Sequence, residues 1–231
     1  MIMKNLLGLW LLLVATTVYG QEFKKKIPAY RYLYVSRGVE AHLVYSDADE
    51  VTIRTKGLQP EDIIVEGGHD ELRIKVATKG LWQEMQDNYW WVKVEIPYQQ
   101  LEGLEVKTGA KVWADRSLRA GRLDMRVSMG ARAELTIEAD DLSLEVSMGS
   151  VVELAGSADY LNVETSMGAE ADLRKLTAGK VRAKANMGSQ LEVTATEEFD
   201  GQASMGSEIH LFGSPERFYR STSMGGEIIR K

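Results

Sequence analysis

Cysteine is absent from this 231-residue chain, and histidine occurs only three times. The lack of cysteine excludes disulfide frameworks, cysteine nucleophiles, zinc–thiolate sites and thioether-linked lipid anchors. His42, His69 and His210 show neither a metal-ligand spacing nor a Ser-His-Asp arrangement. Phosphate-binding glycine loops are missing as well. We therefore expect no enzyme activity, no cofactor and no metal site.

Excess positive charge is also lacking, because 28 Lys and Arg stand against 34 Asp and Glu, for a net charge of -6. This balance disfavours a nucleic-acid partner. Hydrophobic residues make up 44% of the chain and charged residues 27%, which is typical of a folded protein with a core.

Long hydrophobic runs are confined to the N-terminus. Residues 1–20 carry Lys4 and then a run of mostly apolar residues from Leu6 to Ala15, shorter than the ~20 residues that span a bilayer. This pattern is typical of a secretory signal peptide, with cleavage expected between Gly20 and Gln21; an uncleaved anchor is the alternative. The mature chain is expected to have no transmembrane segment and to be exported, to the periplasm, the outer membrane or the outside of the cell.

A repeat of about nineteen residues dominates the C-terminal half. The tripeptide Ser-Met-Gly, once Asn-Met-Gly, recurs with spacings of 18 to 20 residues, and its methionines are Met129, Met148, Met167, Met187, Met205 and Met224. Such a fixed period indicates stacked repeats.

Each copy alternates apolar and polar residues with period two, as in a strand with one buried face. Leu123, Met125 and Val127 share a parity in the first copy, and later copies repeat it. Extending this parity predicts that the six methionines lie inside the fold, where each would contribute about 1.5–3 kcal/mol by burial.

The predicted fold class is therefore all-β: a β-solenoid or stacked β-roll with coils of about 19 residues. The period leaves no room for a helix of useful length, and the leucine-rich repeat pattern is absent. Residues 21–100 are strand-rich without the methionine motif and are expected to cap a stack that starts near residue 101 and continues to 231. In this cap, Arg37-Gly38 predicts a hairpin between two strands.

A glycine follows every repeat methionine. These glycines are expected to allow a bend with positive φ at a corner of the coil, and the serines before the methionines to bond to the turn or along the stack. The six positions are Gly130, Gly149, Gly168, Gly188, Gly206 and Gly225.

Taken together, the layout resembles the bacterial "putative auto-transporter adhesin, head GIN domain" family. The resemblance covers residues from about 30 to the end and rests on Val35-Ser36-Arg37-Gly38-Val39, on Val94-Glu95-Ile96-Pro97 and on repeats such as Ser204-Met205-Gly206-Ser207-Glu208-Ile209. Family members usually have a small residue where this chain has methionine, so a wider or differently filled interior is expected. The family name implies surface adhesion.

Two sets of residues are candidate binding sites. In four successive repeats, an acidic residue lies four positions after the glycine: Glu134, Glu153, Asp172 and Glu192. This acidic stripe is either a solvated face or a docking site for cations or a basic surface. Tyr89 and Trp91 are expected to face outward, where they either pack under a loop or stack on sugar rings. The sugar hypothesis expects glycan binding to be lost in Trp91→Ala and retained in Tyr45→Ala.

The function expected from these patterns is non-enzymatic adhesion or envelope scaffolding, with a surface glycan or an envelope protein as partner. A glycan-binding or polysaccharide-active β-helix is the alternative. An accessory protein of envelope stress or signalling is a third possibility.

Overall fold

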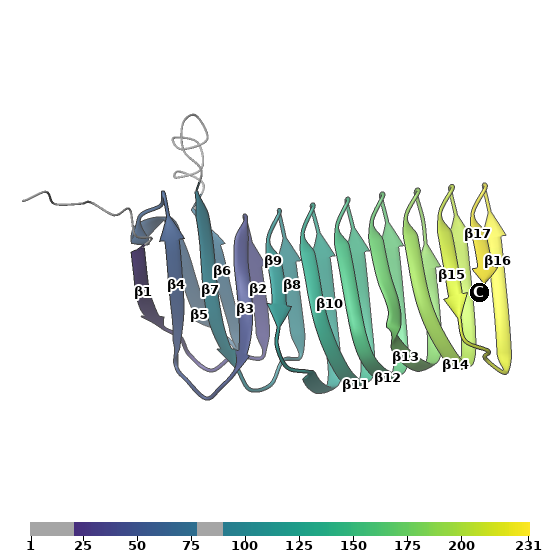
Figure 1. Ribbon diagram of the computed structural model, residues 1–231, viewed down its shortest axis with the longest axis horizontal. Coiled ribbons are helices and arrows are strands. Elements are labelled where there is room, and N and C mark those ends of the chain that lie inside the picture. The colour runs from purple at the N-terminus through teal and green to yellow at the C-terminus, as the bar shows by residue number, and fades with distance from the viewer. Residues whose placement is uncertain (1–20, 78–89) are drawn as a thin grey trace, which may run out of the picture.

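A computed structural model describes residues 21–77 and 90–231, which form one long stack of strands (Figure 1). The expected signal peptide lies outside the described residues. Apart from one 3-10 turn, η1 (Pro60–Asp62), the regular elements are seventeen strands. They are β1 (Gln21–Lys26), β2 (Tyr32–Ser36), β3 (Val39–Tyr45), β4 (Glu50–Lys56), β5 (Ile63–Gly68), β6 (Glu71–Val76), β7 (Trp91–Tyr98), β8 (Gly103–Lys107), β9 (Lys111–Ala114), β10 (Leu118–Ser128), β11 (Arg132–Ser147), β12 (Val151–Ser166), β13 (Glu170–Ala185), β14 (Gln190–Ser204), β15 (Glu208–Phe212), β16 (Arg217–Ser223) and β17 (Glu227–Arg230).

The strands of the described residues form one continuous sheet, and the predicted β-solenoid is confirmed. β2, β3 and β6 to β17 pair in parallel around a common axis, while β1, β4 and β5 add antiparallel pairs at the N-terminal end. β11, β12 and β13 pair in parallel, and Leu142 lies opposite Leu161, which lies opposite Val181. Because each residue meets its counterpart about nineteen positions on, the sequence period is the length of one coil.

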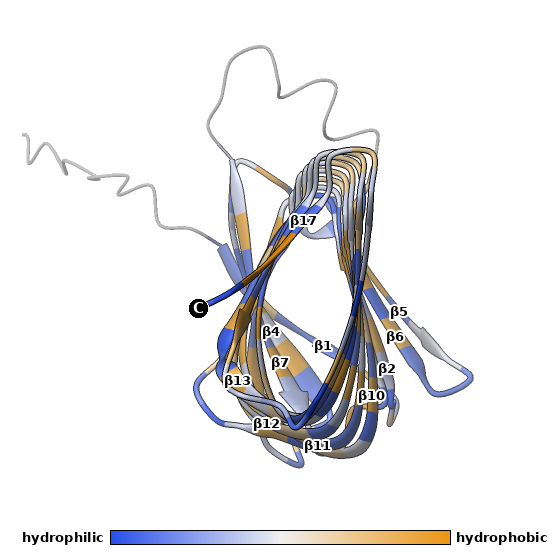
Figure 2. Cartoon of the chain, turned by 90° about the vertical axis from the view of Figure 1, so that its right-hand side faces the viewer, coloured by the Kyte–Doolittle hydropathy of each residue, from blue (hydrophilic) through white to orange (hydrophobic). Residues whose placement is uncertain are grey.

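Each full coil is a long strand bent once in the middle and closed by a tight turn. Seen along the axis, the coils superimpose as a flattened ring (Figure 2). β11 runs down one side as residues 132–139 and up the other as residues 141–147. Every coil therefore has a turn edge, where methionine and glycine lie, and a bend edge at the opposite end.

The interior is filled by the residues that alternation places inside. Leu123, Met125 and Val127 are at most 1% exposed, and the small residues after the glycines, such as Ala131 and Ser189, are fully buried. The buried apolar side chains form one cluster that extends from Ile27 to Ile228. The N-terminal strands and the repeats thus share a single core.

The prediction that the repeat methionines lie inside is wrong. All six are 45–75% exposed, and all six have positive φ, from 47° to 60°. The glycines that follow them also have positive φ, which confirms their expected role and gives both central residues the conformation of a type I′ turn. The turn reverses the chain, so methionine points to solvent although its parity matches the core, and Leu, Val, Ala, Thr and Ser fill the interior.

Asparagine at a turn methionine is expected to stabilise the protein. Met167 has φ 53°, a conformation that costs an ordinary L residue roughly 1–2 kcal/mol and that asparagine tolerates. Because Met167 is 46% exposed, little burial is lost with it. Urea denaturation of Met167→Asn should show a free energy of unfolding raised by several tenths to ~1 kcal/mol. A fall of that size would contradict the turn geometry.

The parallel stack also includes strands that precede residue 101. β2 pairs in parallel with β8, and β3 with β9, while β2 and β3 do not pair with each other. Arg37-Gly38 is therefore not a hairpin turn: its φ values of 60° and 70° match those of the Met-Gly turns, and Gly38 N–H donates to Thr108 C=O at 3.0 Å. It is the first of eight such turns in one row.

No helix in the described parts of the chain is long and apolar enough to cross a membrane.

Candidate functional site

The acidic stripe lies where the repeat predicts it. Glu134 pairs with Glu153, Glu153 with Asp172 and Asp172 with Glu192, so four acidic side chains follow one another across the outer surface of β11 to β14. His210 continues the row on β15. This alignment follows from the constant coil length.

Arg174 neutralises one end of the acidic stripe. Its guanidinium lies 2.5 Å from Asp172 Oδ2 and 2.9 Å from Glu192 Oε2. The hydrogen bonds from Arg174 are the main reason that the pKa of Asp172 is lowered from its usual value. Within the described residues, no group of three or more His, Cys, Asp or Glu side chains is arranged to hold a metal ion. Docking of cations on this stripe stays a prediction.

The aromatic candidates are not brought together in a cavity of the described residues. Tyr89 lies outside those residues. On β7, Val92, Val94 and Ile96 are buried as expected, and Trp91 is partly exposed with Lys93 Nζ 5.8 Å from its ring centroid. Trp90 packs over Gly38, at the first turn of the row.

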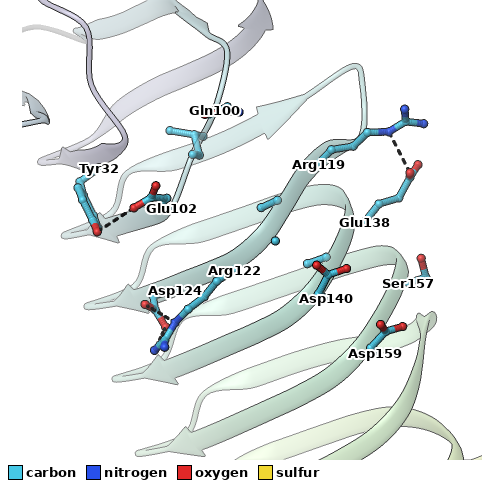
Figure 3. Close-up of a pocket in the computed structure, with 14 residues that line it drawn as sticks. Tyr32, Gln100, Glu102, Arg119, Arg122, Asp124, Glu138, Asp140, Ser157 and Asp159 are labelled. Carbon is cyan, nitrogen blue, oxygen red and sulfur yellow. Dashed lines mark hydrogen bonds and ion pairs between the residues drawn. The ribbon is translucent and has the colours of Figure 1, made fainter.

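Two large hollows of the described residues lie on the bend edge, near the N-terminal coils. Two cavities of about 950 and 940 Å³ share Gln100 and Arg119, and together they form a groove that we call the bend groove. Figure 3 shows its first half, where side chains from successive coils face the same hollow. The residues lining the first cavity are Tyr32, Gln100, Leu101, Glu102, Arg119, Ala120, Gly121, Arg122, Asp124, Glu138, Ala139, Asp140, Ser157 and Asp159; those lining the second are Tyr45, Tyr98, Gln99, Gln100, Asp115, Arg116, Ser117 and Arg119.

The first half of the groove is lined by paired charges. Tyr32 donates its hydroxyl proton to Glu102 Oε2 at 3.1 Å, Arg119 Nε lies 3.0 Å from Glu138 Oε2, and Arg122 Nε lies 3.3 Å from Asp124 Oδ2 (Figure 3). These pairs hold donors and acceptors in place. Asp140 and Asp159 also line this half and have no ion pair among the described residues, so the polar surface carries excess negative charge.

The second half is built around two tyrosines at the ends of neighbouring strands. Tyr45 ends β3 and Tyr98 ends β7, and the two residues are paired in register. Their rings meet edge to face, with centroids 5.8 Å apart, and Arg116 Cζ lies 5.3 Å from the Tyr45 centroid. Tyr45 remains 55% exposed, so these neighbours fix its orientation without covering it.

Tyr98 contributes a buried hydroxyl to the same half. The residue is 4% exposed, and its Oη has no hydrogen-bond partner among the described residues. Burial is the main cause that raises the pKa of this phenol, so the group stays a neutral donor. An unpaired buried hydroxyl costs about 1–3 kcal/mol, and a ligand oxygen that accepts from it would recover part of that cost.

Sequence reasoning missed this groove because its parts come from segments that lie far apart in the chain. Residues 99–102 follow β7, residues 115–117 connect β9 to β10, and Tyr45 ends a strand far earlier in the chain. The bends of β10, β11 and β12 supply most of the first half. The one sequence signal was the run of polar residues, Gln99-Gln100 and Asp115-Arg116-Ser117, at strand ends.

Comparison with known proteins agrees with this architecture. The family model described as "Putative auto-transporter adhesin, head GIN domain" matches residues 29–215. The chain belongs to this family. No curated protein matches the chain in sequence.

Solved structures share the fold of this family member at low sequence identity. One of a putative adhesin from Bacteroides fragilis is 15% identical, with a TM-score of 0.77 over 92% of this chain and 97% of that one. One of a putative adhesin from Parabacteroides merdae is 12% identical, with a TM-score of 0.71 over 93% and 97%. A third, titled putative lipid binding protein, from Parabacteroides distasonis, is 16% identical, with a TM-score of 0.68 over 93% and 98%.

Proposed function

We propose that this family member is an exported, non-enzymatic adhesin that binds a carbohydrate in the bend groove. The observation that carries the proposal is the exposed Tyr45 ring beside the buried, unpaired Tyr98 hydroxyl in a cavity of about 940 Å³. An adhesin needs a rigid shaft and a recognition surface, and the long solenoid with a groove near its N-terminal coils supplies both.

The chemistry of the groove suits a sugar. Flat aromatic rings present an apolar face to the C–H groups of a pyranose, while amides and guanidinium groups bond to its hydroxyls. Tyr45 supplies the ring, Gln99 and Gln100 supply planar amides, and Arg116 and Arg119 supply donors in a fixed fork. These groups come from strand ends and short connections, so few of them must be ordered when the ligand binds.

The same lining argues against an acyl chain. A lipid tail needs a mainly apolar pocket, whereas charged and amide side chains predominate in both halves of the groove.

Glycan binding by the Tyr45→Ala variant tests this function. The purified protein is first screened on a glycan array, and the affinity for the strongest glycan is then measured by calorimetry. Tyr45→Ala is expected to weaken that affinity roughly tenfold or more, because the variant removes the exposed ring and its contact with Arg116.

Two matched controls separate the groove from general surface aromatics. Tyr219 on β16 has the same exposed fraction as Tyr45, 55%, and lies outside the groove; Tyr219→Ala should bind normally. Trp91→Ala should also bind normally, which reverses the expectation from sequence. Normal binding by Tyr45→Ala, or loss only in Trp91→Ala, would overturn the assignment of the groove.

A further inference from the structure

The six turn methionines form a straight row along the turn edge, opposite the bend groove. We call this row the Met ridge: Met129, Met148, Met167, Met187, Met205 and Met224. The turns line up along one edge of the stack in Figure 1. Each turn is tied to the next, since Gly149 N–H donates to Met167 C=O at 3.1 Å and Gly168 N–H to Met187 C=O at 3.0 Å. The backbone therefore holds the methionines in register.

Neither packing nor turn preference accounts for methionine at these positions. A methionine in a core is retained for the surface it buries, but the ridge side chains are 45–75% exposed. The first central residue of a type I′ turn favours asparagine, aspartate or glycine, and methionine is unfavourable there. The position tolerates polar residues in this chain, because Arg37 and Thr108 occupy it in the first two turns of the row. The property that distinguishes the six later turns is a solvent-accessible thioether.

We infer that the Met ridge binds Cu(I), or a soft monovalent cation like it, through the thioether sulfur atoms of neighbouring coils. Thioethers are soft ligands that select Cu(I) over the hard cations that carboxylates prefer. Neighbouring coils lie about 4.8 Å apart, so the Cα atoms of three consecutive ridge methionines span about 10 Å. Methionine has three rotatable bonds, and three such side chains can converge on one ion from this spacing.

Charge favours the middle of the ridge. Thioethers are neutral and leave the charge of a bound cation uncompensated, so nearby carboxylates help. Glu145 and Glu164 lie three residues before Met148 and Met167, and Glu170 lies three residues after Met167. Glu145 pairs in register with Glu164, which places both on the same side of the ridge. Arg126 and Lys184 are the basic residues in that column: Arg126 Nε lies 3.4 Å from Glu145 Oε2, and Lys184 pairs in register with Glu164. Glu164 and Glu170 lie on either side of Met167, so we place the ion at Met167 and its two neighbours in the ridge, Met148 and Met187.

Nuclear magnetic resonance of the protein labelled with 13C in its methionine methyl groups tests the site. Ag(I) serves as a stable probe, and Cu(I) is added under anaerobic, reducing conditions. One equivalent of Ag(I) should shift the methyl signals of Met148, Met167 and Met187. The signal of Met125, which is 1% exposed in the core, is the internal control and should not move.

Matched variants separate the thioethers from their apolar bulk. The triple variant Met148→Leu, Met167→Leu, Met187→Leu keeps side chains of similar size but removes three sulfur atoms. It should weaken Ag(I) and Cu(I) binding roughly tenfold or more, because loss even of outer-shell partners costs 10–100-fold. Met125→Leu should bind both ions as the wild type does.

The pH dependence distinguishes sulfur ligands from histidine. A thioether has no proton to lose, so the affinity for Ag(I) should be nearly the same at pH 7.5 and pH 5. An imidazole site would weaken over that range, since the unperturbed pKa of histidine is about 6.5. Unchanged methyl signals, unchanged affinity in the triple variant, or a tenfold loss at pH 5 would each overturn the inference. Tyr45→Ala should bind Ag(I) normally, so the outcome is independent of glycan binding.

Discussion

Gly156→Ala is expected to lower the free energy of unfolding by about 2–6 kcal/mol. Gly156 lies in β12 with φ 113°, a conformation that L side chains rarely adopt, and a Cβ there would collide with the carbonyl oxygen of Ile137. The two residues are paired in register on neighbouring coils, so the backbone cannot move apart without breaking the stack. Strained φ costs about 1–3 kcal/mol and overpacking adds a similar amount. Urea denaturation followed by circular dichroism measures the effect.

Gly149→Ala is the matched control. Gly149 also has positive φ, 66°, but nothing lies within 4 Å of a Cβ built there. Its substitution should cost only the conformational penalty, roughly 1–2 kcal/mol. Equal losses for the two variants would show that neighbouring coils do not approach each other at Gly156 as described.

Met125→Ala is expected to lower the free energy of unfolding by about 2–5 kcal/mol. Met125 is 1% exposed and packs between Leu104 on β8 and Leu144 on β11, so alanine loses buried surface and leaves a cavity. The comparison variant is Met148→Ala, whose side chain is 45% exposed at the turn edge. We expect Met148→Ala to change the free energy of unfolding by about 0.5 kcal/mol or less.

These two methionine variants test the orientation of the repeats directly. Both changes delete the same atoms, and only their burial differs. A large loss for Met148→Ala together with a small one for Met125→Ala would put the repeat methionines inside the solenoid and remove the basis for the Met ridge.

The two edges of the coil have separate roles in these proposals. The bend groove lies near the N-terminal coils and is lined by non-repeating segments together with the bends of β10 to β12, whereas the Met ridge repeats along the opposite edge. Substitutions in one are therefore expected to leave the other intact, and each proposal can fail without the other.

The orientation of the methionines shows why a correct period gave a wrong position. Alternation correctly places Val127 and Ala131 inside, and Met129 shares their parity. Assigning side chains to faces by alternation assumes an extended strand. The alternation does not hold across two consecutive residues with positive φ, because the chain reverses there. Arg37-Gly38 and Thr108-Gly109 carried the missing signal, because a charged residue and a polar residue occupy the methionine position in equivalent turns.

The sequence by itself determined the coil length, the buried columns and the order of the acidic stripe, from Glu134 to Glu192. These follow from local regularities. A nineteen-residue repeat places equivalent residues of neighbouring coils next to each other, and alternation assigns each side chain to the inner or the outer face. Only the tertiary structure decided that methionine caps the turns, that β2 and β3 belong to the stack, and that Tyr45, Tyr98 and Arg116 meet in one groove. Those features depend on backbone reversal and on contacts between segments far apart in the chain, which no periodic pattern encodes.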